Sequence, residues 1–223
     1  MIATTPSLIN LLDAIEHLPS GGVLSFEDVT WREYEKLLEA LGDGYHVRIS
    51  YDSGRLEIMS PTDWHDYYKS LLGHLVGVLT EELNLGCVSF GSTTFRKEGK
   101  AKGTEPDDCF YITNVKSVIG NPGLDLDRDP PPDLAIEVDI SHQSQSKFPI
   151  YAALGVPEIW RYRKGQMYFY RLSGQNYLEI QASDLFSFLT PQALAGFLDQ
   201  DYIRDFNEVK REFRKWVQDN KLV

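Results

Sequence analysis

Glu137 lies inside an apolar stretch, Leu134 to Ile140, whose length and composition are those of a buried β-strand. A charged side chain in such a strand is costly unless it is paired or bound to a metal ion. A second acidic residue, Asp107, precedes the apolar stretch Cys109 to Ile112. Two carboxylates that meet at a sheet edge are ligands that Mg²⁺ or Mn²⁺ prefers. The two acids therefore predict a divalent-metal site.

Lys147 is the third residue that can take part in this chemistry. A short helix is expected from Lys147 to about Gly155, and the residues on the same helical face as Lys147 are apolar: Ile150, Tyr151 and Leu154. Because this face must pack on the sheet, Lys147 points inward and needs a carboxylate partner. There it can orient or help deprotonate an attacking water, or neutralise charge on a phosphate. The alternative is a surface lysine whose stem covers apolar side chains.

The segment around Glu137 reads as a strand–helix–strand unit. The first strand is followed by a polar link, Ser141 to Ser146, then by the helix, and then by the apolar run Val156 to Tyr162. Such a unit builds a parallel pair of strands, so we expect an α/β fold. Asp139 and His142 are expected to be supporting or loop residues.

The N-terminal part predicts helices around a hairpin. A helix is expected at residues 7–18, and Thr30 with Glu33 forms a capping box that opens a helix from Trp31 to Leu41. Two strands should flank the turn at Asp52, Ser53 and Gly54. A long helix from about Trp64 to Leu83 is predicted by apolar residues at helical spacing: Tyr68, Leu71, Leu72, Leu75, Val76, Leu79 and Leu83.

The middle of the chain predicts one strand and one polar loop. Val88 to Arg96 is the expected strand, and Lys97 to Thr104 the expected mobile loop. The loop lysines, Lys97, Lys100 and Lys102, form a solvated tip, or alternatively an arm that grips phosphates.

The C-terminal part predicts a hairpin and two helices. The hairpin pairs residues 166–172 with residues 177–181, and Thr190 with Pro191 opens a short helix. A final helix from about Asp201 to Gln218 should bury one stripe of apolar residues: Ile203, Phe206, Val209, Phe213 and Trp216. The tyrosines and tryptophans are interpreted as core residues, without an array for stacking nucleic-acid bases.

Composition limits the class of protein. With 223 residues, 42% of them hydrophobic, the chain is most simply one domain. A formal charge of −11 argues against nonspecific coating of nucleic acid. Two cysteines, Cys87 and Cys109, make neither a disulfide framework nor a zinc motif and suit a cytoplasmic protein. No secretory signal and no membrane-spanning apolar run are recognised.

Several motifs together resemble the Uma-type endonuclease family of the restriction-endonuclease-like PD-(D/E)xK superfamily. They are Glu105-Pro106-Asp107, the run Pro132 to Val138, Lys147 with the run Tyr151 to Glu158, and the run Arg55 to Pro61 followed by His65. The similarity spans roughly Val47 to Leu198. It implies a restriction-endonuclease-like α/β core at about residues 45–165, with a central mixed β-sheet flanked by helices. An N-terminal helix and hairpin and a C-terminal hairpin with helices (166–223) are additions to this core.

The resemblance also implies roles for individual residues. Asp107 and Glu137 match the metal-binding acids, and the backbone carbonyl of Val138 is a further ligand for Mg²⁺ or Mn²⁺. The superfamily places a lysine two residues after the second acid, but this chain has Asp139 there. Lys147, in the following helix, matches the position from which the family supplies its lysine.

Glu57 and His65 match recurrent family positions and are expected accessory catalytic residues. Each has a simpler interpretation. Glu57 can be a solvent-facing strand residue, and His65 can merely lie in the first turn of its helix beside Asp63. Asp107, likewise, can belong to a turn that enters a strand.

These residues support one leading function and two alternatives. The first is a divalent-metal-dependent endonuclease that hydrolyses DNA phosphodiester bonds, with a homodimer as the assembly common in such folds. The second is a nuclease fold that serves as a catalytically weak or inactive binding or assembly module. A hydrolase of some other phosphoester is the third, because metal-binding carboxylates do not by themselves define the substrate.

Overall fold

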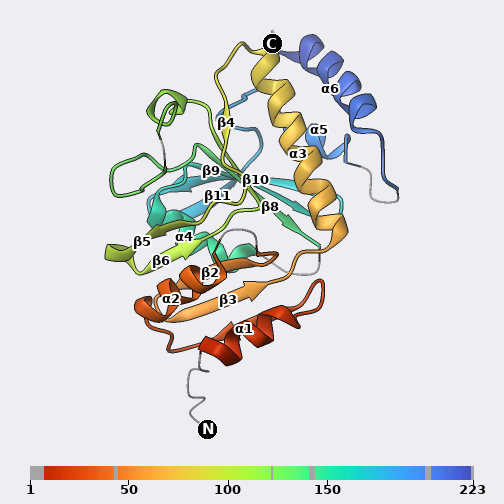
Figure 1. Cartoon of the computed structure of the whole chain (residues 1–223). Helices are drawn as coiled ribbons and strands as arrows, with labels where there is room; N and C mark the ends of the chain where they lie inside the picture. The colour runs from red at the N-terminus through yellow and green to blue at the C-terminus, as the bar shows by residue number, and fades with distance from the viewer. Residues whose placement is uncertain (1–7, 43–44, 122, 141–143, 199–201, 222–223) are drawn as a thin grey trace.

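Two β-sheets and the helices that pack on them make up the structure, a computed structural model that describes residues 8–42, 45–121, 123–140, 144–198 and 202–221 (Figure 1). The larger sheet has the strand order β11-β10-β9-β8-β7-β4. Only β8 and β9 are parallel in it, and the other neighbouring strands are antiparallel. Its strands are β4 (Val88–Ser89), β7 (Asp108–Tyr111), β8 (Leu134–Asp139), β9 (Glu158–Arg163), β10 (Gln166–Ser173) and β11 (Asn176–Ile180). The expected α/β class and mixed sheet are confirmed.

The smaller sheet is entirely antiparallel, with the order β1-β3-β2-β6-β5. Its strands are β1 (Val23–Phe26), β2 (Arg48–Asp52), β3 (Arg55–Met59), β5 (Phe95–Lys97) and β6 (Lys102–Thr104). The predicted hairpin is β2 and β3, which turns at Ser53 and Gly54, both with positive φ. Strand β1 was not predicted, because its four residues, Val-Leu-Ser-Phe, are too short a run to indicate a strand.

Helices α1 (Leu8–Glu16) and α2 (Trp31–Leu41) pack on the smaller sheet. The predicted capping box of α2 is present, since Thr30 Oγ1 accepts from the Glu33 amide and the Glu33 carboxylate accepts from the Thr30 amide. Tyr34 packs so closely on β6 that a Cβ at Gly103 would lie 2.4 Å from the Tyr34 hydroxyl. Glycine at position 103 therefore lets α2 approach the sheet.

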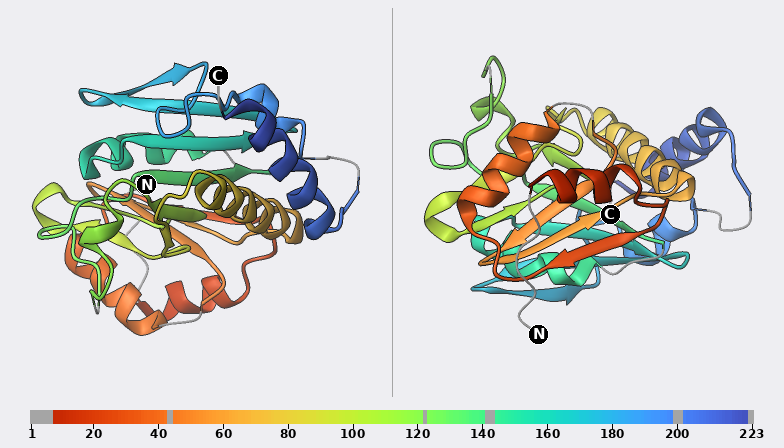
Figure 2. Two further views of the ribbon diagram at one scale, coloured as in Figure 1. Left: turned by 90° about the horizontal axis from the view of Figure 1, so that it is seen from above. Right: turned by 60° about the horizontal axis from the view of Figure 1, so that its bottom comes forward.

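Helix α3 (Asp63–Glu82) and helices α5 (Pro191–Ala195) and α6 (Phe206–Asn220) cover one face of the larger sheet (Figure 2). The apolar face predicted for α3 is buried from Tyr68 to Leu79, and Leu83 is partly buried against the same core. None of the helices in the described ranges is long and apolar enough to cross a bilayer.

The opposite face of the larger sheet is covered by α4 (Phe148–Leu154), which also contacts β5 and β6 of the smaller sheet. A 3₁₀ turn, η3 (Ser144–Lys147), leads directly into α4. Gly155 ends α4 in the left-handed conformation, at φ 86°. Helix α4 therefore lies where the two sheets meet.

Two predictions for the middle of the chain are wrong. Residues 88–96 do not form one strand, because Gly91 turns at φ 59° and separates β4 from β5, which belong to different sheets. The expected mobile loop at residues 97–104 is instead a hairpin of β5, the 3₁₀ turn η1 (Glu98–Lys100) and β6. Lys97 donates to Leu126 O at 3.1 Å, and Lys102 pairs with Asp52. Neither of these two lysines forms a solvated tip.

The last helix begins later than predicted. Asp205 is its N-cap and accepts from the Asn207 amide at 2.9 Å, so α6 starts at Phe206. Ile203 therefore precedes the helix and is 70% exposed instead of buried. The predicted start at Asp201, and the loop residue His142, lie outside the described residues.

Candidate active site

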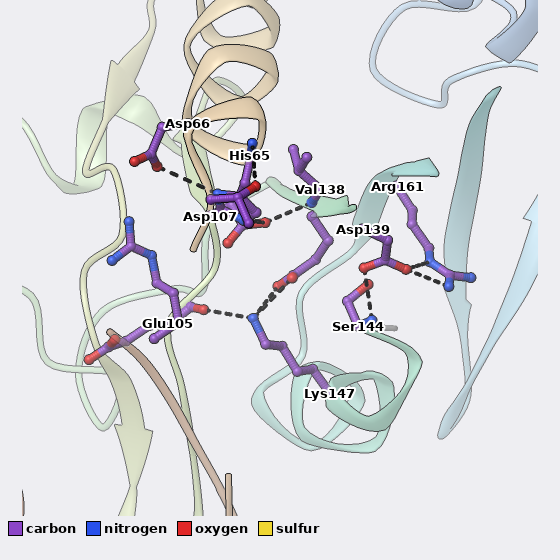
Figure 3. Close-up of polar contacts among 12 residues, drawn as sticks. His65, Asp66, Glu105, Asp107, Val138, Asp139, Ser144, Lys147 and Arg161 are labelled. Atoms are coloured by element: carbon purple, nitrogen blue, oxygen red, sulfur yellow. Dashed lines mark hydrogen bonds and ion pairs between the residues drawn. The ribbon is translucent and has the colours of Figure 1, made fainter. Parts of the chain in front are cut away.

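Asp107 lies immediately before β7 and is joined to β8 through its backbone and its side chain. Its amide donates to Ile136 O at 3.1 Å, and its Oδ2 accepts from the Val138 amide at 2.7 Å (Figure 3). The other carboxylate oxygen, Oδ1, is buried without a hydrogen-bond partner in the described part of the chain. Burial opposes ionisation, but His65 and, to a smaller extent, Lys147 hold the pKa of Asp107 well below its usual range.

Glu137 is central in β8 and points to the face that α4 covers. Lys147 Nζ lies 3.0 and 3.2 Å from its two carboxylate oxygens, and the Tyr151 hydroxyl donates to Oε1. Burial raises the pKa of Glu137 to about 7; the ammonium of Lys147 opposes this rise, and the negative charge of Asp107 adds to it. The charge anticipated in this apolar strand is thus paired inside the fold.

Lys147 is the last residue of η3 and the N-cap of α4. It points inward as predicted, is buried, and also donates to the backbone carbonyl of Glu105 at 3.1 Å. Burial favours the neutral amine, yet Glu137 and Asp107 raise the pKa of Lys147 above its ordinary value. At neutral pH this residue is therefore an ammonium ion, which can attract negative charge but cannot accept a proton.

His65 in the first turn of α3 approaches Asp107 from the opposite side of the site. The N-cap residue Thr62 accepts from the His65 amide at 3.2 Å, which fixes this turn. His65 Nε2 lies 2.9 Å from Asp107 Oδ2, and Nδ1 lies 3.5 Å from Asp66 (Figure 3). Burial acts to lower the pKa of His65, but the Asp107 carboxylate more than offsets it and raises that pKa.

Glu57 lies at the rim of this cluster, on β3. Its side chain is 21% exposed and forms an ion pair with Arg55 at 3.2 Å. The other carboxylate oxygen accepts from Ser146 at 3.4 Å, next to Lys147 in the chain. The structure thus brings Asp107, Glu137, Lys147 and His65 together, and places Glu57 beside them without a recorded contact to the two acids.

Asp139, at the position of the missing superfamily lysine, belongs to a second buried ion pair. Its Oδ2 lies 2.5 Å from Arg161 of β9, and its Oδ1 accepts from the Ser144 amide at 2.9 Å. Asp139 therefore fastens the start of η3, the turn that ends at Lys147. Arg161 was missed, although it is a charge in an apolar strand and so carried the same signal as Glu137.

Two further residues that sequence reasoning did not assign complete the surroundings. Tyr151 follows Lys147 by one helical turn, and this spacing was the available signal for its contact with Glu137. Glu105 is buried between Tyr45 and Thr94, which both donate to its carboxylate, and the Ile49 amide donates to it at 3.1 Å. No local pattern indicated that Glu105 would connect the smaller sheet to Lys147.

The oxygen ligands available here fit Mg²⁺ or Mn²⁺. The unpartnered Oδ1 of Asp107, the Glu137 carboxylate and the Val138 carbonyl are hard donors. In a strand, the N–H and C=O of one residue face the same neighbour, so the Val138 carbonyl faces the side of Asp107. The described residues contain no group of three or more His, Cys, Asp or Glu side chains arranged to hold a metal.

The fold is shared with a solved structure from Anabaena variabilis ATCC 29413, described as "a putative nuclease belonging to DUF820". The two chains are 16% identical, the similarity has a TM-score of 0.50, and it covers 83% of this chain and 99% of the other. No curated protein matches the chain significantly. The mixed α/β fold is therefore similar to that of a protein described as "a putative nuclease". Residues 31–199 match the Uma2 family, described as "Putative restriction endonuclease", and the chain belongs to this family.

Proposed function

We propose that this protein is an endonuclease that hydrolyses DNA phosphodiester bonds with Mg²⁺ or Mn²⁺. Asp107, Glu137 and the Val138 carbonyl would hold the ion, which supplies an activated water and neutralises charge on the scissile phosphate. The observation that carries the proposal is the buried Asp107 carboxylate, whose Oδ1 has no partner in the described chain while Glu137 and Lys147 lie beside it.

The protein's own residues perform the remaining tasks. His65 holds Oδ2 of Asp107, which leaves Oδ1 for a ligand. Tyr151 orients the Glu137 carboxylate, and the ammonium of Lys147 stabilises negative charge that develops on a phosphate next to it. We assign Lys147 electrostatic stabilisation because its side chain is held beside Glu137 and by the Glu105 carbonyl. Glu57, at the exposed rim, is proposed to contact the substrate or a metal-bound water.

The proposal also includes the domain organisation, cellular location and oligomeric state of the protein. We propose a single 223-residue domain that acts in the cytoplasm, where its two free cysteines stay reduced. A homodimer is proposed because symmetric dimers are common in such folds.

The decisive experiment is metal-dependent cleavage by purified protein. Plasmid, linear duplex, single-stranded and branched DNA are incubated with Mg²⁺, Mn²⁺ or EDTA. Asp107→Asn and Glu137→Gln should each abolish cleavage. Asp108→Asn is the matched control, because Asp108 is the adjacent acid but accepts from Ser89 and the Cys109 amide. Cleavage that survives Asp107→Asn, or that occurs with none of these DNAs, contradicts the proposal.

One observation favours the alternative of a binding or assembly module. Glu137 is already neutralised by Lys147 and bonded to Tyr151, and its side chain is buried. Calorimetry with Mn²⁺ separates the two functions. Heat of binding that disappears in Asp107→Asn supports the nuclease, whereas a folded protein without site-dependent binding supports the module.

A further inference from the structure

Trp64 is an exposed aromatic residue at the start of α3, where the sequence had suggested a core position. Trp64 is 38% exposed. The ring stacks on Tyr68, with centroids 5.8 Å apart and an interplanar angle of 25°, and meets Tyr67 edge-on at 5.7 Å. One side of the indole is therefore supported by the fold, while part of it remains accessible.

This aromatic surface adjoins the candidate active site along the chain. Trp64 is followed directly by His65, whose Nε2 is 2.9 Å from Asp107 Oδ2. Figure 3 shows His65 and Val138 converging on Asp107 from α3 and β8. Trp64 therefore lies in the same first turn of α3 as the histidine that contacts the carboxylate proposed to bind the metal.

A second line of contacts leads from Trp64 through the core to β9, the parallel neighbour of β8. Tyr68 packs on Tyr162 with centroids 4.3 Å apart. Tyr162 is the register partner of Val138 in the parallel β8–β9 pair. The stack of Trp64, Tyr68 and Tyr162 therefore ends on β9, which pairs with the strand that contributes the proposed carbonyl ligand.

The Trp64 indole is also positioned by its aromatic neighbours in the unliganded protein. Tyr67, its edge-on neighbour, accepts from the Arg204 amide at 2.9 Å and packs on Phe206. A ring that is already ordered loses little conformational entropy on binding, which favours affinity.

The charges near Trp64 favour a base over a phosphate as its ligand. Asp63 and Asp66 lie in the same helical turn, and the whole chain carries a formal charge of −11. Phosphates are repelled by such surroundings, whereas every nucleobase has a face that stacks on an indole whatever its sequence. Affinity at this end of the site must therefore come from stacking.

We propose that Trp64 is a stacking platform for an unpaired nucleobase next to the scissile phosphate. A base inside a regular duplex is already stacked and cannot use this surface. The proposal rests on the nuclease function above and adds a substrate class: single-stranded, flapped or locally unpaired DNA, in preference to continuous duplex.

Binding in EDTA, where metal-dependent cleavage stops, tests the platform directly. Fluorescently labelled single-stranded, flapped and duplex oligonucleotides are titrated with the full-length protein. Trp64→Ala should raise the Kd for single-stranded and flapped DNA about 10-fold, with little change for duplex. Trp64→Phe, which keeps an aromatic face, should recover most of this loss. Leu178→Ala is the matched control, because Leu178 is another exposed apolar residue, 53% accessible, on β11.

The outcomes separate this proposal from the nuclease function. If Trp64→Ala binds single-stranded DNA as the wild type does, the platform is wrong even when the wild type cleaves DNA with Mn²⁺. If Trp64→Ala loses this binding while the wild type cleaves nothing, the platform stands and the nuclease function falls. A change of oligomeric state in both Trp64 variants, measured by light scattering, identifies the surface as a contact between two copies and also overturns the proposal. Melting curves verify that both variants are folded.

Discussion

The Glu137 carboxylate is held between an ammonium ion and a phenol, and both partners come from the segment that follows its own strand. Lys147 ends η3, and Tyr151 lies one turn further along α4. Taking the charges of Glu137 and Lys147 out of water costs several kcal/mol per ion, which their attraction offsets only while both are present. The pair is therefore a sensitive point for stability as well as for the proposed chemistry.

Replacing Lys147 by Met should destabilise the protein by about 3 kcal/mol at pH 8, because it leaves Glu137 buried without a counter-charge. Urea denaturation measures this loss. In the double variant with Glu137→Gln the two losses should not add, since no buried charge remains in the pair. Additive losses, or a Lys147→Met variant as stable as the wild type, contradict the inferred pairing.

Replacing Tyr151 by Phe removes the hydroxyl that favours the ionised form of Glu137. Protons compete with the metal, so Mn²⁺ affinity of the wild type should fall as the pH drops through about 7, the pKa of Glu137. Loss of the hydroxyl raises this pKa further, and Tyr151→Phe should lose affinity at a higher pH. Calorimetry at pH 6, 7 and 8 shows the shift, with Tyr168→Phe, an exposed hydroxyl bonded to Gln166, as the control. Identical pH curves would falsify the orienting role.

At the scale of elements, the connection from β8 to α4 decides where Lys147 lies. The superfamily pattern places the lysine on the second-acid strand itself, whereas here Asp139 occupies that position and binds both Arg161 and the Ser144 amide. Strand β8 thus carries a charged residue, Asp139, at this position, and Asp139 anchors η3, the turn that ends at Lys147. In this chain the ammonium beside Glu137 comes from the segment that follows the strand.

Asp139→Asn should destabilise the protein by about 3 kcal/mol, because Arg161 stays buried without an anion. The double variant Asp139→Leu with Arg161→Met removes both charges and should recover much of that stability. DNA cleavage should remain impaired in the double variant, since the anchor of η3 is still missing. Recovery of cleavage together with stability means that the pair only fills the core and does not position Lys147.

At the scale of the whole molecule, the two sheets meet at the candidate site. Lys147 is held both by Glu137 of the larger sheet and by the carbonyl of Glu105, which follows the last strand of the smaller sheet. The surrounding charge is negative overall, and Lys97, Lys102 and Arg161 are bonded to acceptors within the chain. Because the net charge is negative, we expect substrate binding to involve few phosphate contacts.

Single-stranded DNA binding should therefore depend only weakly on salt. Each phosphate contact contributes roughly −0.7 to the slope of log Kobs against log salt. We expect a slope no steeper than about −2 between 50 and 200 mM NaCl, which corresponds to about three contacts or fewer. Fluorescence anisotropy over this range measures it. A slope near −6 would contradict this expectation and indicate many phosphate contacts.

The elements with strong local signals could be predicted from the sequence. The periodicity of α3, the capping box of α2 and the apolar run of β8 each depend on neighbours only a few residues away. The predicted element boundaries were wrong where a single residue sets them, at Gly91 between β4 and β5 and at Asp205 before α6. A turn or a cap breaks an apolar pattern without changing the composition around it.

For the site, the sequence by itself determined which groups needed partners. Burial of Glu137 in an apolar strand and of Lys147 on an apolar helical face is costly without a counter-charge. Asp107 immediately precedes the adjoining strand. Only the tertiary structure decided the pairing: His65 on Asp107, Tyr151 on Glu137, and Arg161 on Asp139. The need for a partner follows from the desolvation of one residue, a local property. The identity of the partner depends on sheet register and helix packing between segments far apart in the chain, which no local pattern contains.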